Sequence, residues 1–170
     1  EILDLSKKLN IYNEIPELLS VSLGAAETTL INLTSAYAPF VNGGIKIEPK
    51  LISRIQDRRG KTIFQEKNRE CIGCDKFINE DIELPKIKNN SKKVISEETA
   101  YQMNSILQGA VKRGTAKKLR DLKVPIAGKT GTTNNNYDAW FIGFTSNLVI
   151  GVYVGFDAPK TLGKYETGSK

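Results

Sequence analysis

Histidine is absent from this chain of 170 residues, and cysteine occurs only twice. The absence of histidine excludes Ser-His-Asp and Cys-His catalysis and any histidine-ligated metal from this stretch. Acid–base chemistry in the chain therefore falls to lysine or to carboxylates. No apolar run is long enough to span a membrane, and nothing at the start resembles a signal peptide. We therefore expect any membrane anchor to lie outside this chain.

The two cysteines, Cys71 and Cys74, are separated by two residues. Such a pair forms a local disulfide, a redox pair or half of a zinc site. No second pair and no histidine completes a zinc site, and no βαβ pattern surrounds the pair. In an oxidising compartment we expect a disulfide that ties the loop, with free thiols as the alternative.

The charge is basic but dispersed. The formal net charge of +6 comes from 25 Lys and Arg against 19 Asp and Glu. Local basic clusters lie at residues 58–61 and 112–120, without the interleaved aromatics or the recognisable module that nucleic-acid binding needs. We therefore expect no nucleic-acid partner, and a solvated basic surface that faces an anionic wall or membrane is the simpler interpretation.

Apolar residues at helical spacing predict helices over residues 1–9, 29–42 and 96–113, and a short one over 18–23. Thr29 and Ser96 are the expected N-caps of the two longer internal helices, which end at glycines. The last helix has a predicted buried stripe: Ala100, Met103, Ile106, Leu107, Ala110 and Val111.

Turn residues at 57–60 predict a hairpin of residues 51–56 and 61–65. Residues 66–93 are charged, Asn-rich and irregular, and we interpret them as an insertion or mobile loop. Residues 125–133, 138–144 and 148–155 are expected to form a three-stranded antiparallel sheet whose last two strands are well buried. With helices to cover the sheet, the predicted class is α+β, in a single domain.

Residues 129–133, Lys-Thr-Gly-Thr-Thr, combine a positive charge, hydroxyls and a glycine. β-Branched threonines favour a strand, in which Thr130 and Thr132 lie on one face and Lys129 on the other. At a sheet edge such a strand binds an extended peptide by adding it to the sheet, and Gly131 gives the peptide clearance. The lysine then holds the carboxylate of the peptide.

Two other interpretations fit parts of this segment. An ordinary surface strand with an ordinary lysine is the simplest. A Walker A phosphate-binding loop also ends in the pattern Gly128-Lys129-Thr130. That interpretation fails because Lys123 stands where the first glycine of the motif belongs, and strand-like sequence follows instead of a helix.

Four segments in this order, residues 36–44, 114–116, 129–133 and 138–143, resemble the transpeptidase domain of class A penicillin-binding proteins. The resemblance to the bifunctional type 1A branch covers most of the chain and is weakest over residues 66–93. The Lys-Thr-Gly triplet alone is a weak signal, whereas the ordered set is specific. The resemblance implies the penicillin-binding protein/β-lactamase-like fold, an antiparallel sheet flanked by helices.

The family carries three motifs, Ser-x-x-Lys, Ser-x-Asn and Lys-Thr-Gly. The first two are absent from this chain and lie upstream in the family, which also places a last helix after this stretch. We therefore expect residues 1–170 to be the C-terminal portion of the domain, incomplete at both ends, with residues 66–93 as a loop insertion. These residues alone are predicted to be inactive and to bind no penicillin covalently.

For the parent protein the resemblance implies a peptidoglycan D,D-transpeptidase. A serine, deprotonated with help from the motif lysine, attacks the D-Ala-D-Ala end of a stem peptide, and the acyl group passes to an amine of a neighbouring strand. Carried over by position, Lys129 and Thr132 are catalytic, through positive potential and an oxyanion N–H. The substrate-binding residues implied are Thr130, Gly131, Thr132 and Thr133.

The implied partners are peptidoglycan stem peptides and β-lactam antibiotics, with no cofactor and no metal. The implied location is the periplasmic face of the bacterial inner membrane, through an anchor outside this chain, with a glycosyltransferase domain in the same protein. Two alternatives stay open. One is a β-lactamase or D,D-carboxypeptidase relative, and the other is a non-catalytic module that binds a peptide or an anion at the edge strand.

Overall fold

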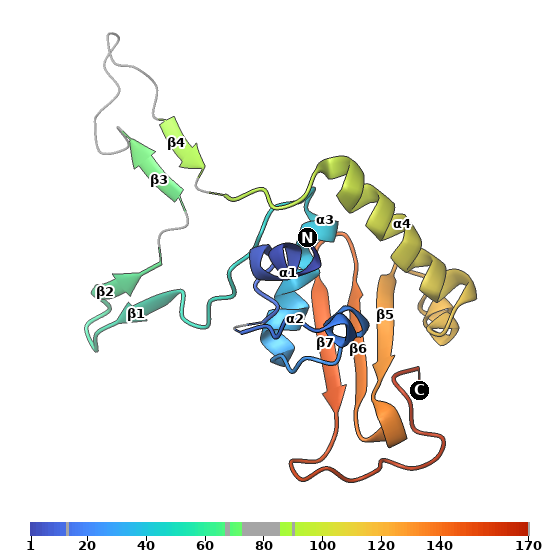
Figure 1. The fold of residues 1–170 in the computed structure, drawn as a ribbon. Helices are drawn as coiled ribbons and strands as arrows, with labels where there is room; N and C mark the ends of the chain where they lie inside the picture. The colour runs from blue at the N-terminus through green and yellow to red at the C-terminus, as the bar shows by residue number, and fades with distance from the viewer. Residues whose placement is uncertain (13, 67–68, 73–85, 90, 170) are drawn as a thin grey trace. The chain divides into compact units, whose positions relative to one another are not determined.

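The computed structural model describes residues 1–12, 14–66, 69–72, 86–89 and 91–169 (Figure 1). The chain falls into two compact units. The main unit consists of Glu1–Ile47 and Lys93–Lys170, and the hairpin unit of Glu48–Lys92. Within the described part of the chain, no helix combines the length and the apolar character needed to cross a bilayer.

A three-stranded antiparallel sheet forms the centre of the main unit, in the order β5, β6, β7 (Figure 1). Its strands are β5 (Ala127–Thr132), β6 (Ala139–Phe144) and β7 (Val149–Val154). The predicted sheet is thereby confirmed. Among the described residues β5 has a strand neighbour on one side only, so it is an edge strand.

Helices cover one face of this sheet. Helix α4 (Glu97–Arg113) packs on β5, and α2 (Leu30–Ala36) packs on β7 (Figure 1). The core cluster between them joins Leu107 of α4 to Ala127 and Phe144 of the sheet. Since side chains alternate along a strand, Lys129 and Gly131 share the helix-covered face with Ala127, and Thr130 lies on the opposite face.

The caps of the helices follow the sequence prediction. The hydroxyl of Ser96 accepts the N–H of Thr99 at 3.2 Å, and the hydroxyl of Thr29 accepts the N–H of Asn32 at 3.2 Å. Helix α1 (Ile2–Lys8) and the 3₁₀ helix η1 (Leu19–Leu23) also lie where they were expected. These short elements precede the sheet in the chain.

The expected single helix over residues 29–42 is wrong. The structure has α2 and a separate short helix, α3 (Ala38–Val41), that meet at Tyr37. Pro39 lacks the N–H that a continuous helix would donate to residue 35, so the ladder breaks there. Pro39 is fully buried, so this break belongs to the core.

Two burial predictions are also corrected. Ile106 on α4 is 66% exposed, because it lies off the side of the helix that packs on β5. Strand β7 is not well buried: Ile150, Val152 and Val154 are 49%, 46% and 53% exposed. These three alternate residues point to the face of the sheet opposite α2.

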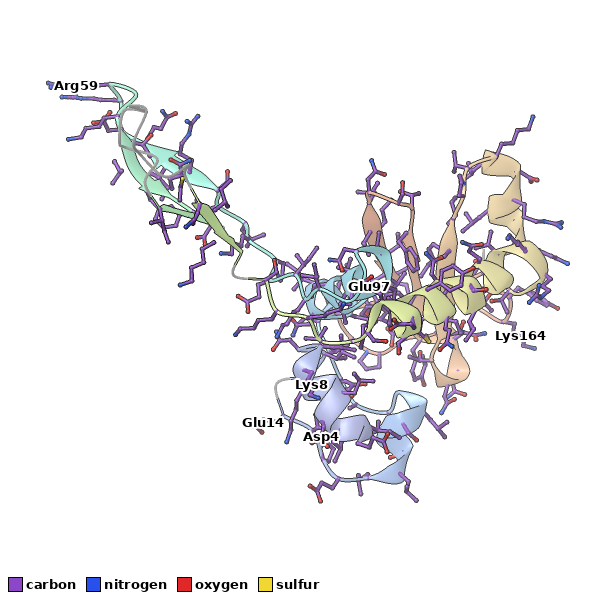
Figure 2. All side chains as sticks on the ribbon, turned by 90° about the horizontal axis from the view of Figure 1, so that it is seen from above. Asp4, Lys8, Glu14, Arg59, Glu97 and Lys164 are labelled. Carbon is purple, nitrogen blue, oxygen red and sulfur yellow. The ribbon has the colours of Figure 1, made fainter. Side chains whose placement is uncertain are left out.

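The hairpin unit contains two separate antiparallel pairs. Strands β1 (Arg54–Gln56) and β2 (Thr62–Gln65) form the predicted hairpin, and Arg59 lies in its turn (Figure 2). In that turn the Asp57 carboxylate accepts the N–H groups of Arg59 and Lys61 at 2.8 and 2.9 Å.

The expectation that residues 66–93 are irregular is wrong in part. Strands β3 (Arg69–Ile72) and β4 (Lys86–Asn89) pair within this range. Cys71, on β3, is disulfide-bonded. Cys74 lies outside the described residues, so the Cys71–Cys74 pairing stays a prediction, as does the interpretation of this range as an insertion.

Candidate active site on the edge strand

Lys129 lies at the open edge of the sheet. Its side chain is exposed, and Nζ donates a hydrogen bond to the carbonyl oxygen of Thr130 at 2.6 Å. The backbone groups of Thr130 point away from β6, as the alternation of an antiparallel pair requires. The ammonium group is therefore drawn toward the side of β5 that has no strand partner among the described residues.

The N–H of Thr132 points to the same edge. The N–H of Thr133 donates to the carbonyl of Asp138 at 3.1 Å, so Thr133 faces β6. Because successive backbone N–H groups alternate in direction, the N–H of Thr132 faces outward. A positive charge and an outward backbone N–H thus occupy one open strand edge.

The hydroxyl of Thr130 is held by a different part of the chain. Its Oγ1 lies 2.8 Å from Oγ1 of Thr115, in the Gly114-Thr115-Ala116 turn that follows α4. This turn is tight, because a Cβ on Gly114 would come within 2.8 Å of the Ala110 Cα. The structure therefore brings the second and third segments of the ordered sequence pattern together.

The other threonine hydroxyls also have partners in the chain. Oγ1 of Thr132 accepts the N–H of Gly168 at 3.1 Å, and Oγ1 of Thr133 accepts the N–H of Asp138 at 2.8 Å. The structure does not bring the hydroxyls of Thr130 and Thr132 together with the Lys129 ammonium on one face. The substrate-binding roles of Thr130, Gly131, Thr132 and Thr133 stay predictions.

The return of the C-terminal segment to β5 was missed by the sequence analysis. The carbonyl of Asn136 accepts the N–H of Leu162 at 2.8 Å, and the Asn136 amide donates to the carbonyls of Gly163 and Lys164 at 3.0 and 3.3 Å. These contacts hold residues 162–164 near the end of β5, and Gly168 then reaches Thr132. Residues 161–170 are polar and aperiodic, so the sequence carries no signal that would have placed them there.

A cavity of about 260 Å³ lies on the Thr130 face of the sheet. Its sheet wall is largely apolar and includes Phe141, Val152 and Val154, and residues 167–169 form another part of the lining. The cavity therefore offers an apolar surface next to the Thr115–Thr130 pair, on the side of β5 away from Lys129.

The sequence analysis also missed a second polar network, at the end of the sheet where β5 and β7 end and β6 begins. The phenol hydroxyl of Tyr153 donates to Asp138 Oδ1 at 2.9 Å. This hydrogen bond to the carboxylate raises the pKa of Tyr153 above its ordinary value. The Tyr153 ring packs on Trp140 with a centroid distance of 4.7 Å. This ring contact could have been predicted from the sequence, because in a hairpin of the two predicted strands Trp140 and Tyr153 are cross-strand partners on the same face.

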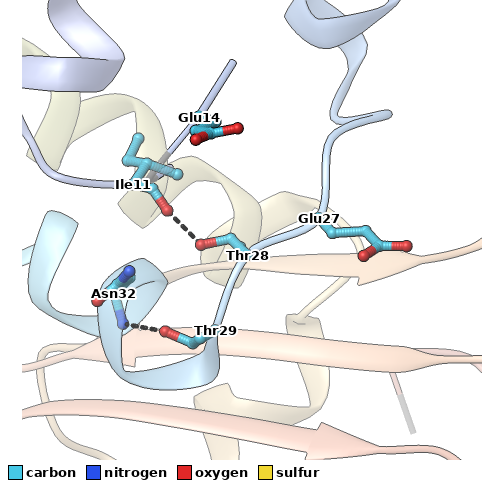
Figure 3. Close-up of a pocket in the computed structure, with 6 residues that line it drawn as sticks. All are labelled: Ile11, Glu14, Glu27, Thr28, Thr29 and Asn32. Atoms are coloured by element: carbon cyan, nitrogen blue, oxygen red, sulfur yellow. Dashed lines mark hydrogen bonds between the residues drawn. The ribbon is translucent and has the colours of Figure 1, made fainter. Parts of the chain in front are cut away.

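A further cavity of about 260 Å³ lies beside the start of α2 (Figure 3). Glu14, Glu27, Thr28 and Thr29 are among the residues that line it. Both hydroxyls have local uses: Thr28 donates to the carbonyl of Ile11, and Thr29 caps α2. Among the residues that the structure describes, no group of three His, Cys, Asp or Glu side chains is arranged to hold a metal ion.

Comparison with known proteins matches this arrangement to one family. The model of the penicillin binding protein transpeptidase domain matches residues 12–170. Penicillin-binding protein 1A of Rickettsia typhi is 46% identical to the chain over 174 aligned positions, which cover 99% of this chain and 22% of the relative. Penicillin-binding protein 1A of Rickettsia prowazekii is 47% identical with the same coverage.

A solved structure agrees with these relatives. The crystal structure of penicillin-binding protein 1A from Haemophilus influenzae superposes on this chain with a TM-score of 0.77 at 33% sequence identity. The superposed part covers 96% of this chain and 27% of the Haemophilus chain. In each case the chain spans well under a third of the protein it resembles.

Proposed function

The chain belongs to the penicillin-binding protein transpeptidase family, and we propose that it forms the C-terminal part of the transpeptidase domain in a type 1A peptidoglycan transpeptidase. The observation that carries this proposal is the open edge of β5, where the Lys129 ammonium and the outward N–H of Thr132 lie together. An edge of this kind suits an extended peptide that ends in a carboxylate.

The proposed reaction is serine acyl transfer. A serine upstream of this chain attacks the penultimate D-Ala carbonyl of a stem peptide, so that an ester bond forms, the peptide bond to the last D-Ala breaks, and the serine proton reaches the leaving amine. An amine of a second stem peptide then attacks the ester, a new peptide bond forms, and the serine recovers its proton. A β-lactam acylates the same serine when its ring amide opens.

In this reaction Lys129 supplies positive potential for the substrate carboxylate, and the N–H of Thr132 is one of two donors to the oxyanion. Loss of one such donor typically slows the reaction about 100-fold or more. Thr130 and Gly131 belong to the same edge, where Thr130 offers its outward backbone groups and Gly131 the clearance of its missing side chain. The hydroxyl of Thr130 lies on the other face of the sheet, 2.8 Å from Thr115 Oγ1. Thr133 follows at the end of that edge, where its N–H and its hydroxyl both bind Asp138, so its proposed part in substrate binding is to fix the residues before it.

The remaining features are proposed at the level of the whole protein. We place a glycosyltransferase domain and a membrane anchor in parts of it beyond this chain, with the transpeptidase on the periplasmic face of the inner membrane. The β-lactamase or D,D-carboxypeptidase alternative predicts rapid deacylation after penicillin opens. The binding-module alternative predicts no covalent adduct at all.

The test uses the full parent protein with penicillin, followed by intact mass and peptide mapping. We expect one adduct, on an upstream serine, that forms about 100-fold more slowly in Lys129→Ala. Lys8→Ala, a change of another exposed lysine in the main unit, is the matched control and should react at the normal rate. A folded parent protein without an adduct would exclude the acyl-transfer function, and the 170-residue chain alone should remain unmodified.

A further inference from the structure

Asp138 binds the strands on both sides of β6 at their ends. Its backbone exchanges two contacts with Thr133: the Asp138 N–H donates to Thr133 Oγ1 at 2.8 Å, and the Thr133 N–H donates to the Asp138 carbonyl at 3.1 Å. Its carboxylate accepts the hydroxyl of Tyr153 from β7 at 2.9 Å. One residue therefore joins the end of the edge strand to the far strand of the sheet.

A row of three residues on one face of the sheet lies next to this connection. Gly131, Trp140 and Tyr153 are opposed across the three strands. The rings of Trp140 and Tyr153 contact at a centroid distance of 4.7 Å. A Cβ on Gly131 would come within 3.3 Å of the Trp140 Cβ, so the Trp140 side chain packs next to the backbone of the edge strand.

The space for the hydroxyl–carboxylate contact depends on a glycine. A Cβ on Gly155 would overlap the Tyr153 hydroxyl and would lie 2.6 Å from Asp138 Oδ1. Any other residue at this position would push the two groups apart. The Tyr153–Asp138 contact thus depends on two parts of the chain, the start of β6 and the end of β7 with Gly155 after it.

We propose that Asp138 and Tyr153 are positioning residues that hold the end of β5, and with it the N–H of Thr132, in the geometry needed for oxyanion binding. This inference rests on the proposed function. Thr132 is adjacent to Thr133, whose N–H and hydroxyl both bind Asp138. An edge strand has one strand neighbour to hold it, and a catalytic donor tolerates displacement of only about 0.5 Å.

The decisive variant is Tyr153→Phe, which removes the hydroxyl and keeps the ring on Trp140. In the full parent protein we expect the rate constant of penicillin acylation at saturation to fall about 10-fold. The penicillin concentration that gives half of this rate should stay within about twofold of normal, because a displaced donor affects the transition state more than the ground state. Asp138→Asn keeps an acceptor oxygen for the phenol and should restore most of the rate that Asp138→Ala loses. Tyr101→Phe, at a tyrosine that is 76% exposed on α4, is the control.

Amide hydrogen exchange of residues 130–133 supplies a readout that does not need the reaction. We expect faster exchange there in Tyr153→Phe, with exchange in α4 unchanged. Unchanged exchange in residues 130–133 overturns the inference, as does a normal acylation rate in a reactive parent protein. If the unaltered parent protein forms no adduct, the proposed function fails, and the exchange measurement still decides the role of Tyr153 and Asp138.

Discussion

The main unit and the hairpin unit both contain antiparallel β-pairs, but only the main unit supports its strands with a buried core among the residues that the structure describes. There, Leu107, Ala127 and Phe144 are 6%, 3% and 4% exposed. In the hairpin unit Ile63 is 69% exposed, and β1 and β2 are exposed throughout. Two-stranded hairpins are marginally stable by themselves. The difference teaches that β5, the edge strand that carries Lys129, belongs to the unit whose strands rest on a buried core.

The largest expected effect comes from a cavity in that core. Leu107→Ala removes a side chain between α4 and the sheet and should lower the free energy of unfolding by about 2–5 kcal/mol. Ile63→Ala, in β2, should change it by less than about 0.5 kcal/mol. Urea unfolding of the parent protein provides the comparison. Equal losses in the two variants would contradict the assignment of the core to the main unit.

A smaller effect is expected where α2 meets the sheet. A Cβ on Gly151 would overlap Thr34 Oγ1 and would lie 3.0 Å from Leu30 Cδ1, so Gly151→Val must displace α2. We expect a loss of about 1–3 kcal/mol in the free energy of unfolding. Gly109→Ala, inside α4, should have the opposite sign and stabilise by about 0.5–1 kcal/mol, since an added Cβ meets only the flexible Arg113 side chain. A stabilised Gly151→Val variant would show that α2 does not pack on β7.

Loss of the α4 cap should cost less again. Ser96→Ala leaves the N–H of Thr99 without its side-chain acceptor and should destabilise the main unit by about 1 kcal/mol. Ser105→Ala, on the exposed surface of the same helix, is the control and should be neutral or stabilise by up to about 0.5 kcal/mol, because alanine is the better helix former. Thermal unfolding of both variants measures the loss of stability. We expect both variants to react with penicillin at the normal rate, which would show that the cap acts on stability and not on catalysis.

The smallest effect is expected from the disulfide of the hairpin unit. Cys71→Ser removes the disulfide-bonded cysteine of β3. Because this strand belongs to the unit without a described core, we expect the penicillin acylation rate of the parent protein to stay within about twofold of normal. Loss of acylation in this variant would show that the active site depends on the hairpin unit, and would break the contrast between the two units.

Much of the main unit could be predicted because its signals are local. Ser96 and Thr29 cap their helices through hydrogen bonds to residues three positions away. Alternation along residues 127–132 places the side chains of Lys129 and Thr130 on opposite faces of the sheet. The break at Tyr37 was missed, although Pro39 was visible, because helical periodicity continues across it. The strands of residues 66–93 were missed because charged and Asn-rich sequence hides short pairs that carry no apolar alternation.

Local sequence signals were enough to predict the sheet, its edge strand and the family, because strand alternation, capping residues and an ordered set of motifs can all be recognised along the chain. The surroundings of that edge depend instead on the tertiary structure. Thr115 meets Thr130, Gly168 meets Thr132, and Tyr153 meets Asp138 through contacts between residues 15 to 36 positions apart. Such contacts depend on where the packed core brings the ends of the elements, and no periodicity in the chain encodes that.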